Sequence, residues 1–160
     1  MTTAANPQEA KMTDTGDNPQ EVRLALAKLA SGAQCDPAPA PQLNGYLLKH
    51  PESPAIYLIL NGLRCQVPDP ATLVGLFVTN RQVHEDFHID LITKGDDIAV
   101  GASLVKGDGS PQQYFLPGKV KMWIRDLTTF SQYQFRQVTT IPQILINSIP
   151  DGPNVQPRTK

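Results

Sequence analysis

The chain has 160 residues, of which 15 are proline and 11 glycine, with 40% apolar and 6% aromatic content and a formal charge of −1. This length fits one domain or two small modules, and the apolar fraction is sufficient for a core. Proline occurs at nearly twice its usual ~5%, which disfavours long helices. The near-zero charge disfavours nucleic acid as a partner. Coiled-coil, collagen-like, histone-like and membrane-spanning classes are therefore excluded.

The aromatic residues are confined to the middle of the chain. All ten lie between Tyr46 and Phe135, so the first 45 residues contain none. A segment without large apolar anchors cannot offset the entropy of ordering its backbone. We therefore expect a largely disordered leader over 1–42 and a disordered tail over 153–160.

One helix is predicted inside this leader, over 19–31. Asn18 suits the capping position, Pro19 suits the first helical position, and Gly32 ends the run. The leucines of this segment form no continuous apolar stripe, so the sequence leaves open whether the helix docks on the core. The prolines over 37–41 predict a polyproline II spacer after it.

The strongest signal in the sequence is an internal repeat. Compared with itself at an offset of 57, the chain has seven identities in the 31 positions from 47 to 77, where composition alone predicts roughly two. The identical pairs are Leu47 and Leu104, Lys49 and Lys106, Ser53 and Ser110, Pro54 and Pro111, Tyr57 and Tyr114, Asp69 and Asp126, and Thr72 and Thr129. We interpret this pattern as a tandem duplication, with repeats over about 45–100 and 101–152.

Each repeat has the pattern of a strand, a hairpin, a short helix and a return segment. In the first repeat, Asn61-Gly62 is a favoured two-residue hairpin turn between β-rich runs. Asp69 and Asp126 then suit the capping positions of short helices. A unit of this size buries little apolar surface alone, so we expect the two repeats to share a core. The predicted fold is α+β, an antiparallel sheet with short helices built from two tandem strand-hairpin-helix repeats, in a globular domain over 43–152.

Several residues of the first repeat carry a resemblance to a known group of proteins. They are Gly45, Leu48, Lys49, Tyr57-Leu58, Asn61-Gly62, Val67-Pro68-Asp69-Pro70 and Thr72-Leu73. This pattern resembles repeat modules found in tandem in uncharacterised bacterial proteins. The second repeat departs from it, with Arg125 and Leu127 in place of the two helix-entry prolines. The resemblance covers 45–152 and implies a bacterial binding or structural module, with no established chemistry.

Residues 84–88 read His-Glu-Asp-Phe-His and match the H-E-x-x-H motif. In that motif two histidines on one helical face bind Zn²⁺ and the glutamate activates a water molecule. The context is unfavourable, because no later Glu or His follows His88 as a third ligand. One alternative is therefore a small zinc-dependent hydrolase with His84 and His88 as ligands and Glu85 as the catalytic residue. This alternative requires a helix over 80–92.

A second candidate site lies on the outward face of the second hairpin. This face gathers Lys119, Lys121 and Trp123, with Arg125 just beyond. A tryptophan among cations can stack on a sugar or a base, and lysines can contact phosphates. The same residues suit a protein-contact patch, or a Trp123 that is covered by the leader helix.

The sequence also bears on location and redox state. No 18-residue apolar stretch spans a bilayer, and the N-terminus lacks a basic region followed by an apolar one, so no secretory signal is visible. The default expectation is a cytoplasmic protein, with non-classical export left open. Cys65 lies on the inward face of its expected strand, which favours a buried thiol over a disulfide with Cys35.

These observations favour a non-enzymatic protein-interaction or structural module without a cofactor. We expect its partner to be an unidentified protein, and the chain itself to be a monomer or a weak oligomer. The alternatives are the zinc hydrolase and a carbohydrate or nucleic-acid binder that uses Trp123 and the nearby cations.

Overall fold

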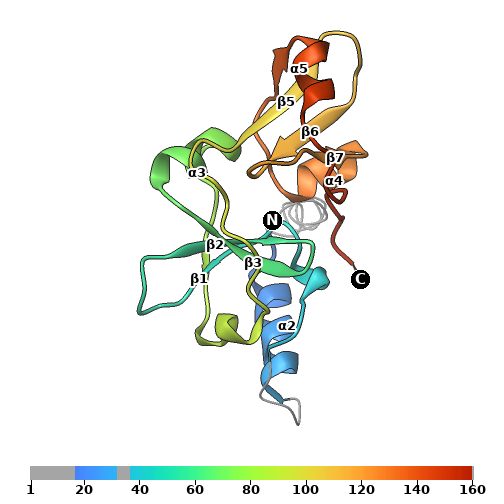
Figure 1. The fold of residues 1–160 in the computed structure, drawn as a ribbon. Coiled ribbons are helices and arrows are strands. Elements are labelled where there is room, and N and C mark those ends of the chain that lie inside the picture. Colours follow the sequence, from blue (N-terminus) through green and yellow to red (C-terminus); the bar gives the residue numbers. More distant parts are fainter. Residues whose placement is uncertain (1–16, 32–36, 160) are drawn as a thin grey trace, which may run out of the picture.

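A computed structural model describes residues 17–31 and 37–159 of the chain. Figure 1 shows two small sheets, one in the lower and one in the upper half of the view, with α3 beside the junction between them. None of the helices within the described ranges is long and apolar enough to cross a bilayer.

The first sheet contains four strands in the order β3-β2-β1-β4. Its strands are β1 (Leu47–Lys49), β2 (Ile56–Leu60), β3 (Leu63–Val67) and β4 (His84–Glu85). Strands β1, β2 and β3 pair in antiparallel fashion, and β4 joins β1 in parallel. The crossover between β3 and β4 carries helix α3 (Pro70–Leu76), and the 3₁₀ helix η3 (Phe87–Leu91) follows β4.

The second sheet has the same topology, in the order β7-β6-β5-β8. Its elements are β5 (Ser103–Gly107), β6 (Gln113–Leu116), β7 (Met122–Ile124), α4 (Leu127–Gln132), β8 (Thr139–Ile141) and α5 (Gln143–Ser148). The α+β class is therefore confirmed, and the two similar sheets support a tandem repeat. Both sheets are mixed rather than antiparallel, because each return strand crosses over through a helix and pairs in parallel.

Backbone hydrogen bonds outside the sheets recur at the same offset of 57. The amide of Gly95 donates to Arg64 O, and the amide of Gly152 donates to Lys121 O. Two further bonds correspond in the same way, from Ile98 N to Gln66 O and from Val155 N to Trp123 O. The structural equivalence therefore extends to Val155, beyond the expected end of the second repeat.

Both short crossover helices begin at the expected capping residues. Asp69 Oδ1 accepts a hydrogen bond of 2.7 Å from the amide of Thr72, and Asp126 Oδ1 accepts one of 2.7 Å from the amide of Thr129. These bonds lower the pKa of both carboxyl groups. The two helices therefore start through the same local interaction.

The inner faces of the two sheets share one core, as the size of a single repeat predicted. Phe135 lies at its centre, stacked on Phe77 and Tyr133 at ring-centroid distances of 5.7 and 5.2 Å. Cys65 and Met122 occupy equivalent buried positions in this core. Cys65 is thus the buried thiol that its strand register predicted. Cys35 lies outside the described residues, so a disulfide between the two is not tested.

Helix α2 (Pro19–Ser31) spans the predicted residues and covers the outer face of the first sheet. Its buried residues Val22, Ala25 and Leu26 pack in an apolar cluster that includes Tyr46 and Ile59. The one helix expected in the leader is therefore present and docked, because the sheet supplies the large apolar anchors that the helix lacks. The leader residues 1–16 and 32–36 lie outside the described residues.

The spacer and the tail are also packed. A 3₁₀ helix, η2 (Pro41–Leu43), buries Leu43 in the same outer cluster. In the tail, Val155 is buried, and Tyr133 Oη donates a hydrogen bond of 2.9 Å to Gln156 O. The expectation of disorder is wrong for residues 153–159, because side chains of both repeats satisfy the polar backbone of this segment. The last residue, 160, is not described.

Candidate functional site

Residues 84–88 do not form the helix that a zinc hydrolase requires. His84 and Glu85 make up strand β4, and η3 begins only at Phe87. Successive strand residues face opposite sides. His84 is accordingly buried, whereas Glu85 is exposed and pairs with Lys49 at 3.4 Å. His88, on η3, is exposed. The two histidines and the glutamate therefore do not share a face, and the geometry of this alternative is absent.

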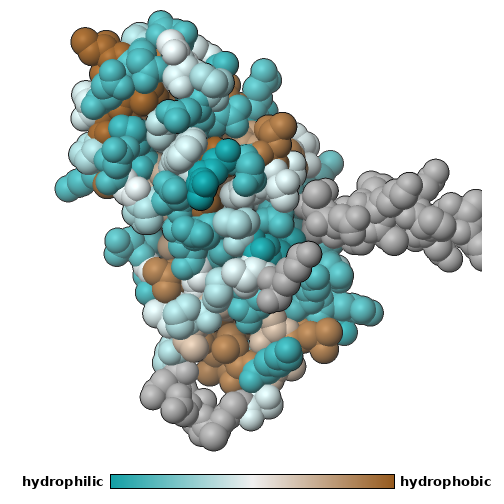
Figure 2. Space-filling model, turned by 90° about the vertical axis from the view of Figure 1, so that its right-hand side faces the viewer, coloured by the Kyte–Doolittle hydropathy of each residue, from teal (hydrophilic) through white to brown (hydrophobic). Residues whose placement is uncertain are grey.

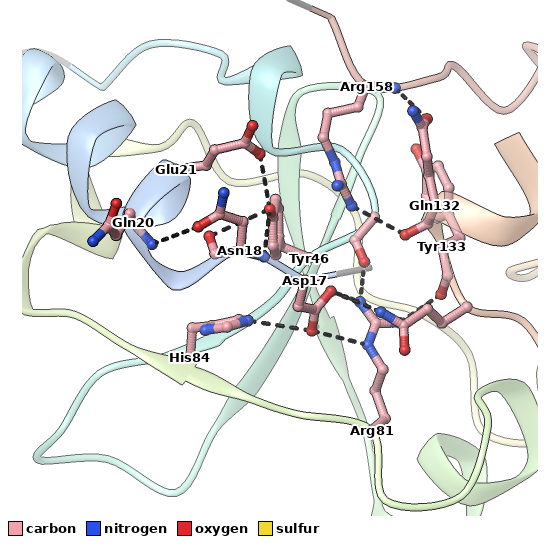
Figure 3. A network of polar contacts seen from close by, with 12 residues as sticks. Asp17, Asn18, Gln20, Glu21, Tyr46, Arg81, His84, Gln132, Tyr133 and Arg158 are labelled. Atoms are coloured by element: carbon pink, nitrogen blue, oxygen red, sulfur yellow. Dashed lines mark hydrogen bonds and ion pairs between the residues drawn. The ribbon is translucent and has the colours of Figure 1, made fainter. Parts of the chain in front are cut away.

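His84 instead points into a buried polar cluster where the leader meets both repeats (Figure 3). The centre of the cluster is Asp17, whose side chain is 5% exposed. Its carboxylate lies 3.4 Å from Arg81 Nη2 and 3.2 Å from His84 Nε2. Gln134 Nε2 donates a hydrogen bond of 2.9 Å to the same group. The contact with His84 has the distance of an ion pair but not the geometry of a hydrogen bond.

The Arg81 side chain is 3% exposed and connects the two repeats. Its guanidinium donates hydrogen bonds to the carbonyl of Gly45 in the first repeat and to that of Tyr133 in the second. Burial lowers the pKa of Arg81, and the charge of Asp17 opposes this effect. An arginine stays protonated in proteins, so this buried cation needs the carboxylate of Asp17 as its counter-charge.

Tyr46 extends the cluster toward α2 and the tail. Its hydroxyl donates a hydrogen bond of 3.0 Å to Glu21 Oε2 and accepts one of 3.0 Å from the amide of Asn18. The guanidinium carbon of Arg158 lies 4.0 Å from the centroid of the Tyr46 ring, in the cation–π range. Burial raises the pKa of Tyr46 to about 12. Tyr46 therefore stays neutral and holds the leader and the tail to the first sheet.

Sequence reasoning missed this cluster except for His84. Asp17 lies in a segment whose composition predicts disorder, and Arg81 and Gln134 belong to no motif. Their partners are 64 and 117 positions away along the chain. Local patterns carry no signal for such contacts, and only the pairing of the two repeats brings these residues together.

The structure separates the residues of the second predicted site. Lys121 is buried, and its ammonium contacts the carbonyls of Ile146 and Ile149 at 3.1 and 2.7 Å and the carboxylate of Asp151 at 3.1 Å. These contacts match the three protons of the group. The same role recurs in the first repeat, where Arg64 Nε donates to the carbonyl of Ile92, the equivalent of Ile149. Lys121 is thus a structural clamp.

The other three residues of that site lie in two places. Trp123 is half-buried, and the guanidinium carbon of the exposed Arg125 lies 5.7 Å from the centroid of its ring. Lys119 is exposed and lines a separate groove of about 440 Å³ between the repeats, together with Asp96 and Cys65. The structure therefore brings Trp123 and Arg125 together and places Lys119 elsewhere.

Trp123 also lines a cleft of about 350 Å³ on the outer face of the second sheet. The other residues that line it are Gln112, Tyr114, Lys121, Asp151, Gly152 and Asn154. Trp123 and Tyr114 are cross-strand neighbours, so their rings stand side by side on one face of the sheet.

Comparisons with protein-family models, with curated proteins and with solved structures found no match. The resemblance to bacterial repeat modules is thus supported only by the two similar sheets, and no family is identified. Among the described residues, no three His, Cys, Asp or Glu side chains converge as metal ligands would.

Proposed function

We propose that the protein is a non-enzymatic protein-interaction module, in which the first repeat is the scaffold and the second repeat contacts the partner. The two repeats differ in how their outer faces are covered. Ile59 and Ile92 in the first repeat are fully buried, and α2 packs in the same cluster. Their equivalents Leu116 and Ile149 in the second repeat are only half-buried. The second repeat therefore has an open outer face.

The observation that carries the proposal is the exposure of α5. In the first repeat α2 packs against η3, the element equivalent to α5. On α5, Ile146 is buried and anchors the helix, but Ile144 and Leu145 are 74% and 51% exposed. Figure 2 shows hydrophobic side chains at the upper end of the molecule, the end at which Figure 1 places α5. Burying two such side chains contributes about 1.5–3 kcal/mol each to an interface.

The first repeat indicates what kind of partner fits this surface. It receives an amphipathic helix with a short apolar face, formed by Val22, Ala25 and Leu26. Because the two repeats share one topology, we expect the partner to contribute an amphipathic helix to the second. The buried charged groups support a non-enzymatic role, since Asp17, Arg81 and Lys121 hold segments of the fold together.

A comparison of surface variants tests this proposal. Proteins would be captured from source cells on three tagged, full-length baits, and the captured proteins would be quantified by mass spectrometry. The baits are the wild type, the double variant Ile144→Glu/Leu145→Glu and the control Leu24→Glu. Leu24 is 65% exposed on α2, so the control adds a charge at a similarly exposed apolar position. Candidates would then be purified and titrated by calorimetry.

We expect one partner to bind the wild type and the control with equal affinity, and the double variant at least about tenfold more weakly, which is about 1.4 kcal/mol. Thermal unfolding of all three proteins should agree, because the substituted side chains are exposed. Equal binding by the double variant, or no partner that binds after purification, would contradict the proposal and leave a structural role.

A further inference from the structure

We infer that the cleft beside Trp123 binds a neutral oligosaccharide. The cleft lies between the outer face of β6 and β7 and the segment that returns after α5. Tyr114 and Trp123 form its aromatic wall as cross-strand neighbours. Asp151 and Asn154 line it from the returning segment, and Gln112 lines it at the start of β6. This activity is separate from the protein contact proposed for α5.

The first repeat is an internal reference for this cleft, because the supporting contacts are the same in both. The guanidinium carbon of Arg64 lies 5.1 Å from the centroid of the Tyr57 ring, and Lys121 Nζ lies 5.6 Å from that of Tyr114. Each cation also binds the carbonyl at the equivalent position of the returning segment. The contacts of the supporting cation, with the tyrosine ring and with the returning segment, are therefore a property of the fold and are not evidence for a ligand.

The residues that line the cleft differ between the repeats. At four lining positions the second repeat has a different residue: Gln112 stands where the first repeat has Ala55, Trp123 where it has Gln66, Asp151 where it has Lys94, and Asn154 where it has Asp97. In the first repeat Lys94 and Asp97 bind one another at 2.9 Å. In the second repeat the equivalent pair is replaced, and Asp151 contacts Lys121 with its side chain still 82% exposed. The second repeat thus has a large aromatic ring in place of one amide and gains the amides of Gln112 and Asn154, while the supporting contacts stay the same.

This lining matches the chemistry of a sugar. An indole ring offers a flat apolar face to the C–H groups of a pyranose, and carboxylate and amide groups bind its hydroxyls. Within 17–31 and 37–159, the one cation that lines the cleft is Lys121, whose three protons already face two carbonyls and Asp151. The charges of Lys121 and Asp151 compensate one another, and the exposed Arg125 guanidinium lies over the Trp123 ring without lining the cleft. No unpaired cation lines the cleft among the described residues, which favours a neutral ligand over a phosphate or sulfate group.

The chain contains a single tryptophan, so tryptophan fluorescence reports on the surroundings of Trp123, and the Asp151 variants assign a response to this cleft. The full chain would be titrated with cellotetraose, chitotetraose and xylotetraose, and with an oligothymidylate as an anionic probe. Asp151→Ala and Asp151→Asn remove the carboxylate from the cleft and keep the reporter. Asp97→Ala is the matched control, because it removes an exposed carboxylate at the first-repeat counterpart of a cleft residue.

We expect a saturable change in emission with at least one neutral oligosaccharide, equal in the wild type and in Asp97→Ala. The affinity should fall by about tenfold or more in Asp151→Ala and less in Asp151→Asn, with the thermal unfolding of Asp151→Asn unchanged. The α5 double variant should bind the sugar normally, so failure of one proposal is distinguishable from failure of the other. No saturable response to any of these sugars, an undiminished response in both Asp151 variants, or a response to the oligonucleotide alone would overturn the inference.

Discussion

The buried cluster around Asp17 makes the fold sensitive to a single change of charge. Asp17→Asn keeps the size of the side chain and one acceptor oxygen but removes the negative charge. Arg81 would then keep its carbonyl partners Gly45 and Tyr133. No second carboxylate of the described residues lies within 4 Å of its guanidinium to replace Asp17. Because the Arg81 side chain is 3% exposed, water cannot replace the lost charge.

The size of the effect follows from this burial. Removing one partner of a buried ion pair costs about 3–5 kcal/mol, because the other charge stays desolvated. Asparagine can still accept the hydrogen bond that Gln134 donates to Asp17 at 2.9 Å, which places the expected loss near the lower end, about 3 kcal/mol. A domain with a total stability of about 5–15 kcal/mol would remain folded after such a loss.

Urea unfolding followed by circular dichroism measures this loss. The matched control is Asp90→Asn, since Asp90 is exposed on η3, and its free energy of unfolding should change by less than about 0.5 kcal/mol. In a double-mutant cycle with Arg81→Met, the two changes together should cost clearly less than their sum, because each removes the same pair. A loss below about 1 kcal/mol in Asp17→Asn, or additive effects in the cycle, would refute the reasoning.

Three further predictions concern groups with shifted pKa values. Asp126→Ala should lower the free energy of unfolding by about 1 kcal/mol in urea melts, because α4 loses its capping side chain. Folding lowers the pKa of Asp69 and Asp126. Both carboxylates therefore stabilise the folded state above the usual pKa of 3.8, and this stabilisation is lost as the pH falls through their pKa values in the folded protein. The free energy of unfolding of the double variant Asp69→Asn/Asp126→Asn should therefore fall less steeply with acid than that of the wild type. Burial raises the pKa of Cys65 to about 11, so in a Cys35→Ser background a thiol reagent at neutral pH should label the folded protein at least about tenfold more slowly than the protein in urea, and equal rates would contradict this burial.

The features that the sequence predicted well depend on interactions between near neighbours. The helix over 19–31, the caps at Asp69 and Asp126, and the turn at Asn61-Gly62 each involve residues within a few positions of one another. Asn61 and Gly62 have φ values of 52° and 83°, as a two-residue hairpin of this kind needs. The similarity between the two halves was visible in the sequence because such local patterns recur at a constant offset of 57.

The features that the sequence did not predict depend on partners that are far away along the chain. The parallel pairing of β4 with β1 joins Leu48 to His84, and this pairing, rather than the local motif, decides the conformation of the H-E-x-x-H residues. Once His84 and Glu85 lie in a strand, alternation places them on opposite faces. The same limit applies to the tail, where the buried Val155 and its neighbours are fixed by groups from both repeats.

Comparison of the two repeats also shows what the buried cluster is for. His84 pairs with β1 as Thr139 pairs with β5, so the two residues hold the same place in their sheets. Thr139 is exposed and only His84 is buried against the leader. Contacts that occur in both repeats, such as the clamps of Arg64 and Lys121, are requirements of the fold itself. The contacts of His84 with Asp17 occur in one repeat only and accompany the docking of the leader, which indicates that the cluster serves to hold α2 over the first sheet and leaves the second sheet open.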